Sequence, residues 1–188
     1  HEVLGSIMEQ VSAILRPANW SLLLVDEERQ ELVFEIAVGP NAATLKGLRI
    51  RIDEGIAGWV AREGRTLLVP DVCADERFAA RFDQATRFTT RSILAVPMRS
   101  RGKTLGLIEL VNGPDHAPFT EHDARTLGSI ADYAAIAIEN ARNFQRVQEL
   151  TVIDEHTGLF DARHLSRVLE AEVTRSRRFR HPLSLIFV

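Results

Sequence analysis

The segment Thr104–Val111 (TLGLIELV) is the feature that most restricts what this 188-residue chain can fold into. Apolar residues occupy both of its alternating faces, and Glu109 is the one charged residue among them. A strand that is apolar on both faces belongs in the middle of a sheet that is covered on both sides. The sequence therefore predicts a layered domain in which a sheet lies between two other sets of elements.

Further strand-length and helical patterns surround this segment. The turn Ser100–Lys103 joins it to a second apolar strand, Ser92–Pro97, and a charged turn joins Trp20–Val25 to Glu31–Val38 in a predicted hairpin. Shorter strands are predicted at 48–52 and 66–69, an amphipathic helix at 3–15 and a short helix at 56–62. The mixed periodicity of 73–90 indicates one or two short helices and a loop.

A helical pattern runs from Thr120 to about Leu150, and Asp123 follows Thr120 at the spacing of a capping box. Its apolar positions alternate three and four apart, which is typical of a heptad seam that pairs with a partner helix. We expect a homodimer through the terminal helices, and packing of the first half on the chain's own sheet is the alternative. The seam residues are Ile130, Ala134, Ala137, Ala141 and Phe144.

Composition excludes several classes of protein. The 23 basic and 26 acidic residues give a net charge of −3, which argues against a general nucleic-acid binder. No apolar run approaches the roughly 18 residues of a membrane span, and no signal peptide is visible, so we expect a cytoplasmic fragment. The single cysteine, Cys73, excludes an internal disulfide and a Cys-rich zinc site, and the histidines show no metal-ligand spacing.

The order of elements and motifs over residues 1–147 resembles a GAF domain. This resemblance implies an α+β fold: an antiparallel central sheet with helices on one face, a ligand-pocket segment on the other, and an extended C-terminal helix. The residues that carry it are Gly55–Val60 (GIAGWV), Val69–Val72 (VPDV), Asp75, Phe78, Ser92–Pro97, Gly106–Asn112 (GLIELVN), Phe119 and Asp123.

The tail resembles the opening of a GGDEF domain, the family of diguanylate cyclases. Residues 154–159 (DEHTGL) match its opening signature with His156 in place of Leu, and Arg175, Arg178 and 182–185 (PLSL) fit the approach to its first strand. We therefore expect a transmitter helix or coiled-coil linker at 127–153, an incomplete GGDEF segment at 154–188 and a final strand at 183–188. The resemblance implies that the whole protein makes cyclic di-GMP, whereas this chain lacks the catalytic loop and is not expected to be an enzyme.

A GAF fold implies a pocket between the sheet and the segment before its fifth strand. Aromatic, hydroxyl and guanidinium groups there suit a small polar or anionic ligand, whose identity the sequence does not reveal. The alternative is that the phenylalanines belong to the core and the arginines to the solvated surface. The candidate pocket residues are Phe78, Phe82, Arg87, Phe88, Thr89, Thr90, Arg91 and Ser92; no cofactor is evident.

The resemblance implies a sensory domain that binds a small molecule or dimerises to control the output domain. Two other functions are a ligand-free dimerisation scaffold and a GAF-fold redox enzyme. Asn112, Phe119 and Asp123 match a motif of cyclic-nucleotide-binding GAF domains, but Gly113 and Ala124 replace its Lys and Glu. The ion pair of that motif therefore cannot form. A redox enzyme resembling the methionine sulfoxide reductases needs a second cysteine, and we expect Cys73 to be an inert, buried residue.

Overall fold

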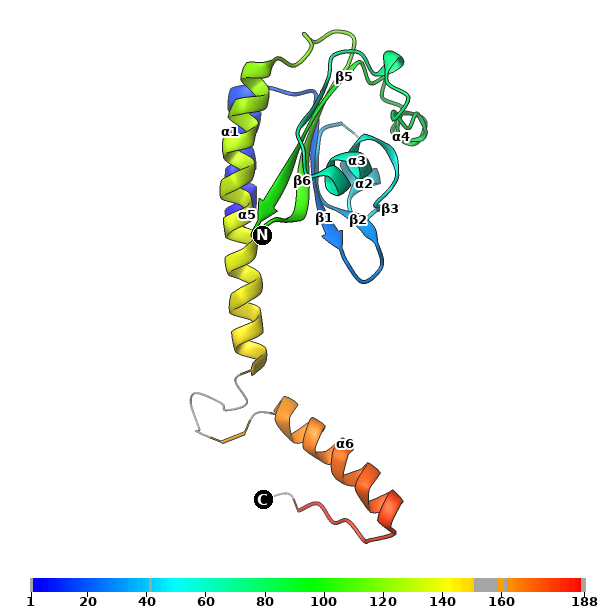
Figure 1. The fold of residues 1–188 in the computed structure, drawn as a ribbon, viewed down its shortest axis with the longest axis vertical. Coiled ribbons are helices and arrows are strands. Elements are labelled where there is room, and N and C mark those ends of the chain that lie inside the picture. The colour runs from blue at the N-terminus through cyan, green and yellow to red at the C-terminus, as the bar shows by residue number, and fades with distance from the viewer. Residues whose placement is uncertain (1, 41, 151–158, 161, 187–188) are drawn as a thin grey trace. The chain divides into compact units, whose positions relative to one another are not determined.

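The computed structural model describes residues 2–40, 42–150, 159–160 and 162–186, which fall into two compact units, 1–140 and 141–188 (Figure 1). Within these ranges no helix combines the length and the apolar character needed to cross a lipid bilayer.

The first unit is built on one six-stranded antiparallel sheet with the strand order β3-β2-β1-β6-β5-β4. β6 lies between β1 and β5, so the central position predicted from its two apolar faces is confirmed. The predicted hairpin of β1 and β2 is also confirmed. The strands are β1 (Asn19–Asp26), β2 (Glu31–Val38), β3 (Arg49–Arg51), β4 (Leu67–Val69), β5 (Ser92–Ser100) and β6 (Lys103–Asn112).

Two long helices lie on one face of the sheet: α1 (Glu2–Leu15) and the part of α5 (Glu121–Leu150) that belongs to this unit (Figure 1). Val11 of α1 and Leu127 and Ala134 of α5 are fully buried in a cluster with Leu22 and Ile108 of the sheet. Small alanine side chains let the backbone of α5 approach the strands closely, so the first half of this helix packs on its own sheet.

Shorter elements cover the opposite face. They are α2 (Ala42–Leu45), α3 (Gly55–Glu63), the 3-10 turn η1 (Val72–Ala74) and α4 (Arg81–Thr86). Leu23 and Leu107 of the sheet are buried there with Ile56 and Val60 of α3. The predicted α+β fold, with different layers on the two faces, is confirmed; α2 is an element that the sequence patterns did not predict.

The junction between β6 and α5 is held by side-chain hydrogen bonds. The backbone N–H of Thr120 donates to Asp123 Oδ2 at 2.8 Å, and the N–H of Asp123 donates back to Thr120 Oγ1 at 3.3 Å, so the predicted capping box is confirmed. Buried Asn112 accepts a hydrogen bond from the N–H of Ala18 and donates one to the carbonyl of Ala117, both at 2.9 Å.

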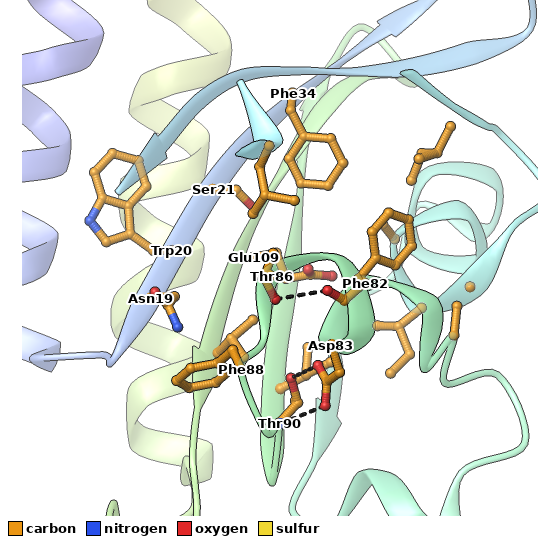
Figure 2. Close-up of a pocket in the computed structure, with 18 of the residues that line it drawn as sticks. Asn19, Trp20, Ser21, Phe34, Phe82, Asp83, Thr86, Phe88, Thr90 and Glu109 are labelled. Carbon is orange, nitrogen blue, oxygen red and sulfur yellow. Dashed lines mark hydrogen bonds between the residues drawn. The ribbon is translucent and has the colours of Figure 1, made fainter. Parts of the chain in front are cut away.

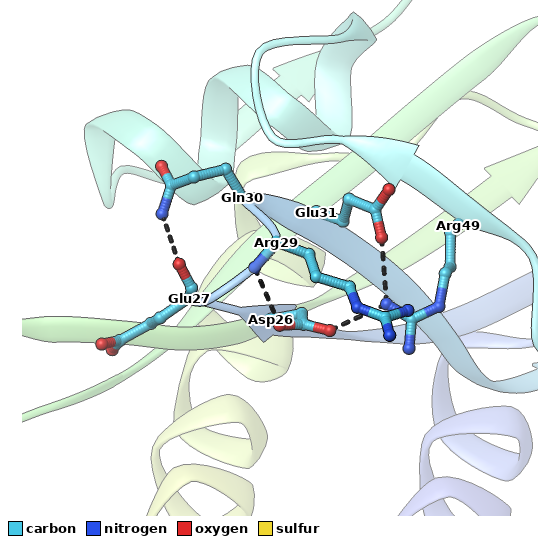
Figure 3. A network of polar contacts seen from close by, with 6 residues as sticks. All are labelled: Asp26, Glu27, Arg29, Gln30, Glu31 and Arg49. Carbon is cyan, nitrogen blue, oxygen red and sulfur yellow. Dashed lines mark hydrogen bonds and ion pairs between the residues drawn. The ribbon is translucent and has the colours of Figure 1, made fainter.

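The turn between β1 and β2 carries an exposed polar network (Figure 3). Arg49 Nη1 lies 2.8 Å from Asp26 Oδ2 and 3.0 Å from Glu31 Oε2, and it holds the pKa of Asp26 below its usual value. Because such exposed ion pairs contribute little to stability, this network serves mainly to join β3 to the hairpin.

The second unit contains α6 (Ala162–Phe179), followed by residues 181–186 without regular structure. The strand expected at 183–188 is therefore wrong for residues 183–186, and 187–188 lie outside the described residues. Within the described residues, 183–186 pair with no strand, and a strand without a neighbour is not stable. The motif residues 154–158 also lie outside the described residues, so the predicted boundary at 154 stays a prediction.

Candidate functional site

A cavity of about 100 Å³ lies between the sheet and the layer formed by α2, α3 and residues 78–90 (Figure 2). Ser21 of β1, Ile93 of β5 and Glu109 of β6 form its floor on the sheet. A cavity of this size holds several water molecules or a small organic molecule.

Four phenylalanines supply the aromatic lining of the cavity: Phe34, Phe78, Phe82 and Phe88. The rings of Phe34 and Phe82 lie 6.2 Å apart and are inclined by 50°, within the range of favourable aromatic pairs. The outer face of Phe82 is covered by the guanidinium of Arg81, 4.8 Å from the ring centroid. The wall is therefore apolar inside and charged outside.

Half of the residues predicted for the pocket line it: Phe78, Phe82, Phe88 and Thr90. Arg87, Thr89, Arg91 and Ser92 do not. Arg87 takes a left-handed conformation that ends α4, and Arg91 lies 3.0 Å from Asp71 in an ion pair.

Ser92 is kept from the cavity by the alternation of side chains along β5. Ile93 faces the cavity, whereas Ser92 precedes Leu94 on the face that packs against α5. The hydroxyl of Ser92 is buried without a hydrogen-bond partner in the part of the chain that the structure describes.

The segment that closes the cavity is tied together by Asp83. Its carboxylate accepts hydrogen bonds from the backbone N–H of Thr90 at 2.7 Å and from the Thr90 hydroxyl at 2.5 Å. The hydroxyl of Thr86 donates to the carbonyl of Phe82 at 2.7 Å within α4. These bonds hold Phe88 at the edge of the cavity (Figure 2).

Glu109 is the most distinctive of the site residues that the sequence-based prediction missed, which also include Ser21 and Phe34. Its cross-strand neighbours are Ser21 on β1 and Ala95 on β5, so small side chains flank it on the floor. Burial raises the pKa of its carboxyl to about 7, because removal from water disfavours the charged form. The signal was present in the sequence as the one charge in an otherwise apolar strand.

The cavity is acidic. Its lining contains Glu54, Asp83 and Glu109, and no Lys, Arg or His is among the described lining residues. Glu54 is paired outside the cavity with Arg81, at 2.6 Å. The two arginines predicted for the pocket, Arg87 and Arg91, do not line the cavity, as the alternative of solvated arginines expected.

The family model of the GAF domain matches residues 1–138. This chain belongs to the GAF domain family. The six-stranded sheet and its two covered faces are the fold that the resemblance implied.

Relatives of this GAF domain occur in signalling proteins. It is 29% identical over 155 residues to the probable 3',5'-cyclic phosphodiesterase pde-5 of Caenorhabditis elegans, covering 78% of this chain and 21% of that protein. The chain thus spans about a fifth of the length of that relative.

Solved structures share the fold. The GAF domain of a phosphoenolpyruvate-protein phosphotransferase from Coxiella burnetii matches with a TM-score of 0.66 at 20% identity, covering 77% of this chain and 95% of that one. A free methionine-R-sulfoxide reductase from Neisseria meningitidis, solved with its substrate, matches with a TM-score of 0.60 at 28% identity, covering 71% of this chain and 74% of that one.

The residues matching the cyclic-nucleotide motif of other GAF domains lie away from the cavity. Asn112, Phe119 and Asp123 are absent from its lining. Asn112 and Asp123 make the hydrogen bonds at the junction of β6 and α5, and Phe119 is buried in the core beneath α5. In this GAF domain the three residues therefore serve the packing of α5.

Cys73 is exposed, so the expectation of a buried cysteine is wrong. Asp71 accepts a hydrogen bond from the Cys73 N–H at 3.1 Å and begins the short turn η1, in which Val72 faces the core. Cys73 does not line the cavity of the GAF domain. In the described part of the chain, no three His, Cys, Asp or Glu side chains are placed to share a metal ion.

The predicted seam of α5 divides between core and surface. Ala134 is fully buried and Ile130 packs against the core of the GAF domain, and Ala137 is half-buried. Ala141 and Phe144, in the second unit, are exposed. Within the GAF unit the exposed apolar residues of α5 are Tyr133 and Ile136, at 70% and 56% exposure.

Proposed function

We propose that this GAF domain senses a small molecule in its cavity and transmits the bound state through α5 to a diguanylate cyclase output domain that begins near residue 154. The observation that carries the sensing role is the cavity of about 100 Å³, with aromatic walls and the carboxyl of Glu109 on its floor. Such a combination is typical of small-molecule sites.

The sheet connects the cavity to α5. Ile93 and Glu109 line the cavity, and their sequence neighbours Leu94 and Ile108 are buried on the opposite face in the cluster that contains Leu127 of α5. Because packed interiors are dense, a shift of these strands on ligand binding changes the surface on which α5 rests. This gives a physical route from the ligand to the helix.

The proposed output rests on the sequence of the tail. Asp154, Thr157, Gly158 and Leu159 match the opening signature of GGDEF domains, and α5 ends four residues before Asp154. A change in α5 would therefore reach the output domain directly. The test is cyclic di-GMP synthesis by a protein carrying the whole output domain, compared with a variant in which Ser21→Leu fills the cavity.

We further propose that α5 pairs with its counterpart in a homodimer. Tyr133 and Ile136 are large, apolar and exposed on the outer side of a helix whose inner side is core. Sedimentation of the purified chain at micromolar concentration should show a dimer that Ile136→Glu dissociates. The control Leu48→Glu, at an exposed apolar residue before β3, should leave the dimer intact, and a wild-type monomer contradicts the proposal.

The second candidate is a dimerisation scaffold without a ligand, which the exposed residues of α5 also support. Native mass spectrometry of the purified chain separates the two functions. A retained small molecule, absent from the Ser21→Leu variant, supports sensing, whereas an unliganded dimer supports the scaffold.

A thiol-dependent redox function is disfavoured because Cys73 lies outside the cavity. A substrate held in the cavity would not meet the only thiol of the chain. The purified chain should show no turnover of free methionine sulfoxide above the rate of a Cys73→Ser variant.

A further inference from the structure

We propose that the cavity selects a small molecule, about the size of one aromatic ring, that donates N–H hydrogen bonds to Glu109 and presents no negative charge to the sheet. This inference rests on the proposed ligand-binding function and adds the chemical class of the ligand.

The position of Glu109 makes it the recognition group of the floor. It stands on β6 between Ser21 and Ala95, so its cross-strand neighbours leave space above the carboxyl. Among the described residues, none donates a hydrogen bond to it or forms an ion pair with it, and Figure 2 shows it among the aromatic and hydroxyl side chains of the lining. A buried carboxyl without a partner is costly, and a ligand that donates hydrogen bonds removes that cost.

The other two acids of the cavity already have partners. Glu54 is paired with Arg81, and Asp83 accepts both hydrogen bonds from Thr90. Both are therefore occupied, which leaves Glu109 as the acceptor open to a ligand. No Lys, Arg or His among the described lining residues would balance an anion, which would meet three carboxyl groups.

The aromatic lining suits the same ligand class. The rings of Phe34, Phe82 and Phe88 offer apolar area to a flat body, and the face of an aromatic ring attracts a cation. A planar group with two N–H donors on one edge also matches the two oxygens of a carboxylate.

The protonation of Glu109 gives the interaction a pH dependence. Burial raises the pKa of Glu109 to about 7, so a cation that favours the ionised form must displace a proton below this pH. The other titratable side chains of the described lining already have partners, since Glu54 is paired with Arg81 and Asp83 with Thr90. Affinity for a cation should therefore rise about tenfold between pH 6 and pH 8, following the ionised fraction of Glu109.

Benzamidine and benzoate form a matched pair of probes, because each carries a planar charged group on the same ring, positive in benzamidine and negative in benzoate. Calorimetric titration of the whole 188-residue chain at pH 8 should give benzamidine at least a tenfold lower Kd than benzoate. Benzamide, a neutral N–H donor on the same ring, distinguishes recognition of the N–H groups from recognition of the positive charge.

The variant Glu109→Gln should raise the Kd for benzamidine at least tenfold and abolish its pH dependence, while the exposed control Glu76→Gln should change neither. Absence of benzamidine binding, equal or tighter binding of benzoate, or an unchanged affinity in Glu109→Gln overturns the inference. Ligand sensing as such is judged separately, by the co-purified molecule in native mass spectrometry, so that an anionic molecule retained by the chain would refute the ligand class and leave sensing intact.

Discussion

The carboxylate of Asp83 holds Thr90 by two hydrogen bonds, one from the backbone N–H at 2.7 Å and one from the hydroxyl at 2.5 Å. This pair ties the loop that follows α4 back onto the helix, and Phe88 within that loop lines the cavity. The wall of the candidate site is thus positioned by a local polar contact as well as by packing.

Thr90→Val should lower the free energy of unfolding by about 2 kcal/mol, since the hydroxyl donates to a charged, partly buried acceptor and the change keeps the shape of the side chain. Urea denaturation measures the loss. The neighbouring control Thr89→Val alters an exposed residue and should cost less than about 0.5 kcal/mol. Equal losses in the two variants would show that the contact with Asp83 has no special role.

Glu109 should make the protein less stable as the pH rises. The carboxyl has a pKa of about 7 when folded and an ordinary value of 4.5, so between these pH values the folded protein keeps a proton that the unfolded chain releases. The free energy of unfolding that Glu109 contributes is therefore fully present below pH 4.5, falls up to pH 7 and then levels off. The loss is at most about 3 kcal/mol, because the cavity admits water.

Glu109→Gln should remove this dependence. The variant should match the wild type near pH 4.5 and exceed it at pH 8, as measured by thermal unfolding across the pH range. Glu76→Gln, at an exposed position, serves as the control and should retain the wild-type slope. A wild-type slope in Glu109→Gln would show that another group causes the dependence.

Two glycine-to-alanine substitutions should change the free energy of unfolding in opposite directions. A Cβ at Gly58 would lie 2.7 Å from the carbonyl oxygen of Ile52, so Gly58→Ala should cost about 1–3 kcal/mol. Gly128 lies inside α5 with no heavy atom within 4 Å of a Cβ, and Gly128→Ala should add about 0.5–1 kcal/mol. Thermal unfolding of both variants tests the assignment, and a shift of the same sign in both would contradict it.

Asn112→Ala should lower the free energy of unfolding by about 2 kcal/mol, because it removes hydrogen bonds to the backbone of Ala18 and Ala117. Asn140→Ala on the exposed side of α5 should cause no loss. Chemical denaturation compares the two. A structural role predicts that Asn112→Ala leaves the relative affinities for benzamidine and benzoate unchanged, whereas a reversal would place Asn112 in ligand recognition.

Much of the fold was predictable because residues close together in the sequence determine it. The two apolar faces of 104–111 placed β6 in the middle of the sheet, and the spacing of Thr120 and Asp123 located the start of α5. The final strand was the exception: the apolar character of 183–186 indicated a strand, but among the described residues these four pair with no strand.

The candidate site was predicted only in part. Phe78, Phe82, Phe88 and Thr90 line the cavity as expected. The segment that contains them has no regular periodicity, so the outward direction of Arg87 and Arg91 could not be derived from spacing. Cys73 likewise faces solvent because of the turn that Asp71 begins, although free cysteines are more often buried.

The sequence by itself determined the layers, the central strand and the family of this protein, since periodicity and capping act between residues close in the chain. Only the tertiary structure decided the charge of the cavity. It brings Glu109 beside Ser21, 88 positions away in the chain, and turns the arginines toward Asp71 and solvent. The environment of a buried charge depends on the residues that long-range strand pairing places around it. The sequence therefore showed Glu109 only as a charge in an apolar strand, and the tertiary structure made it the proposed recognition group.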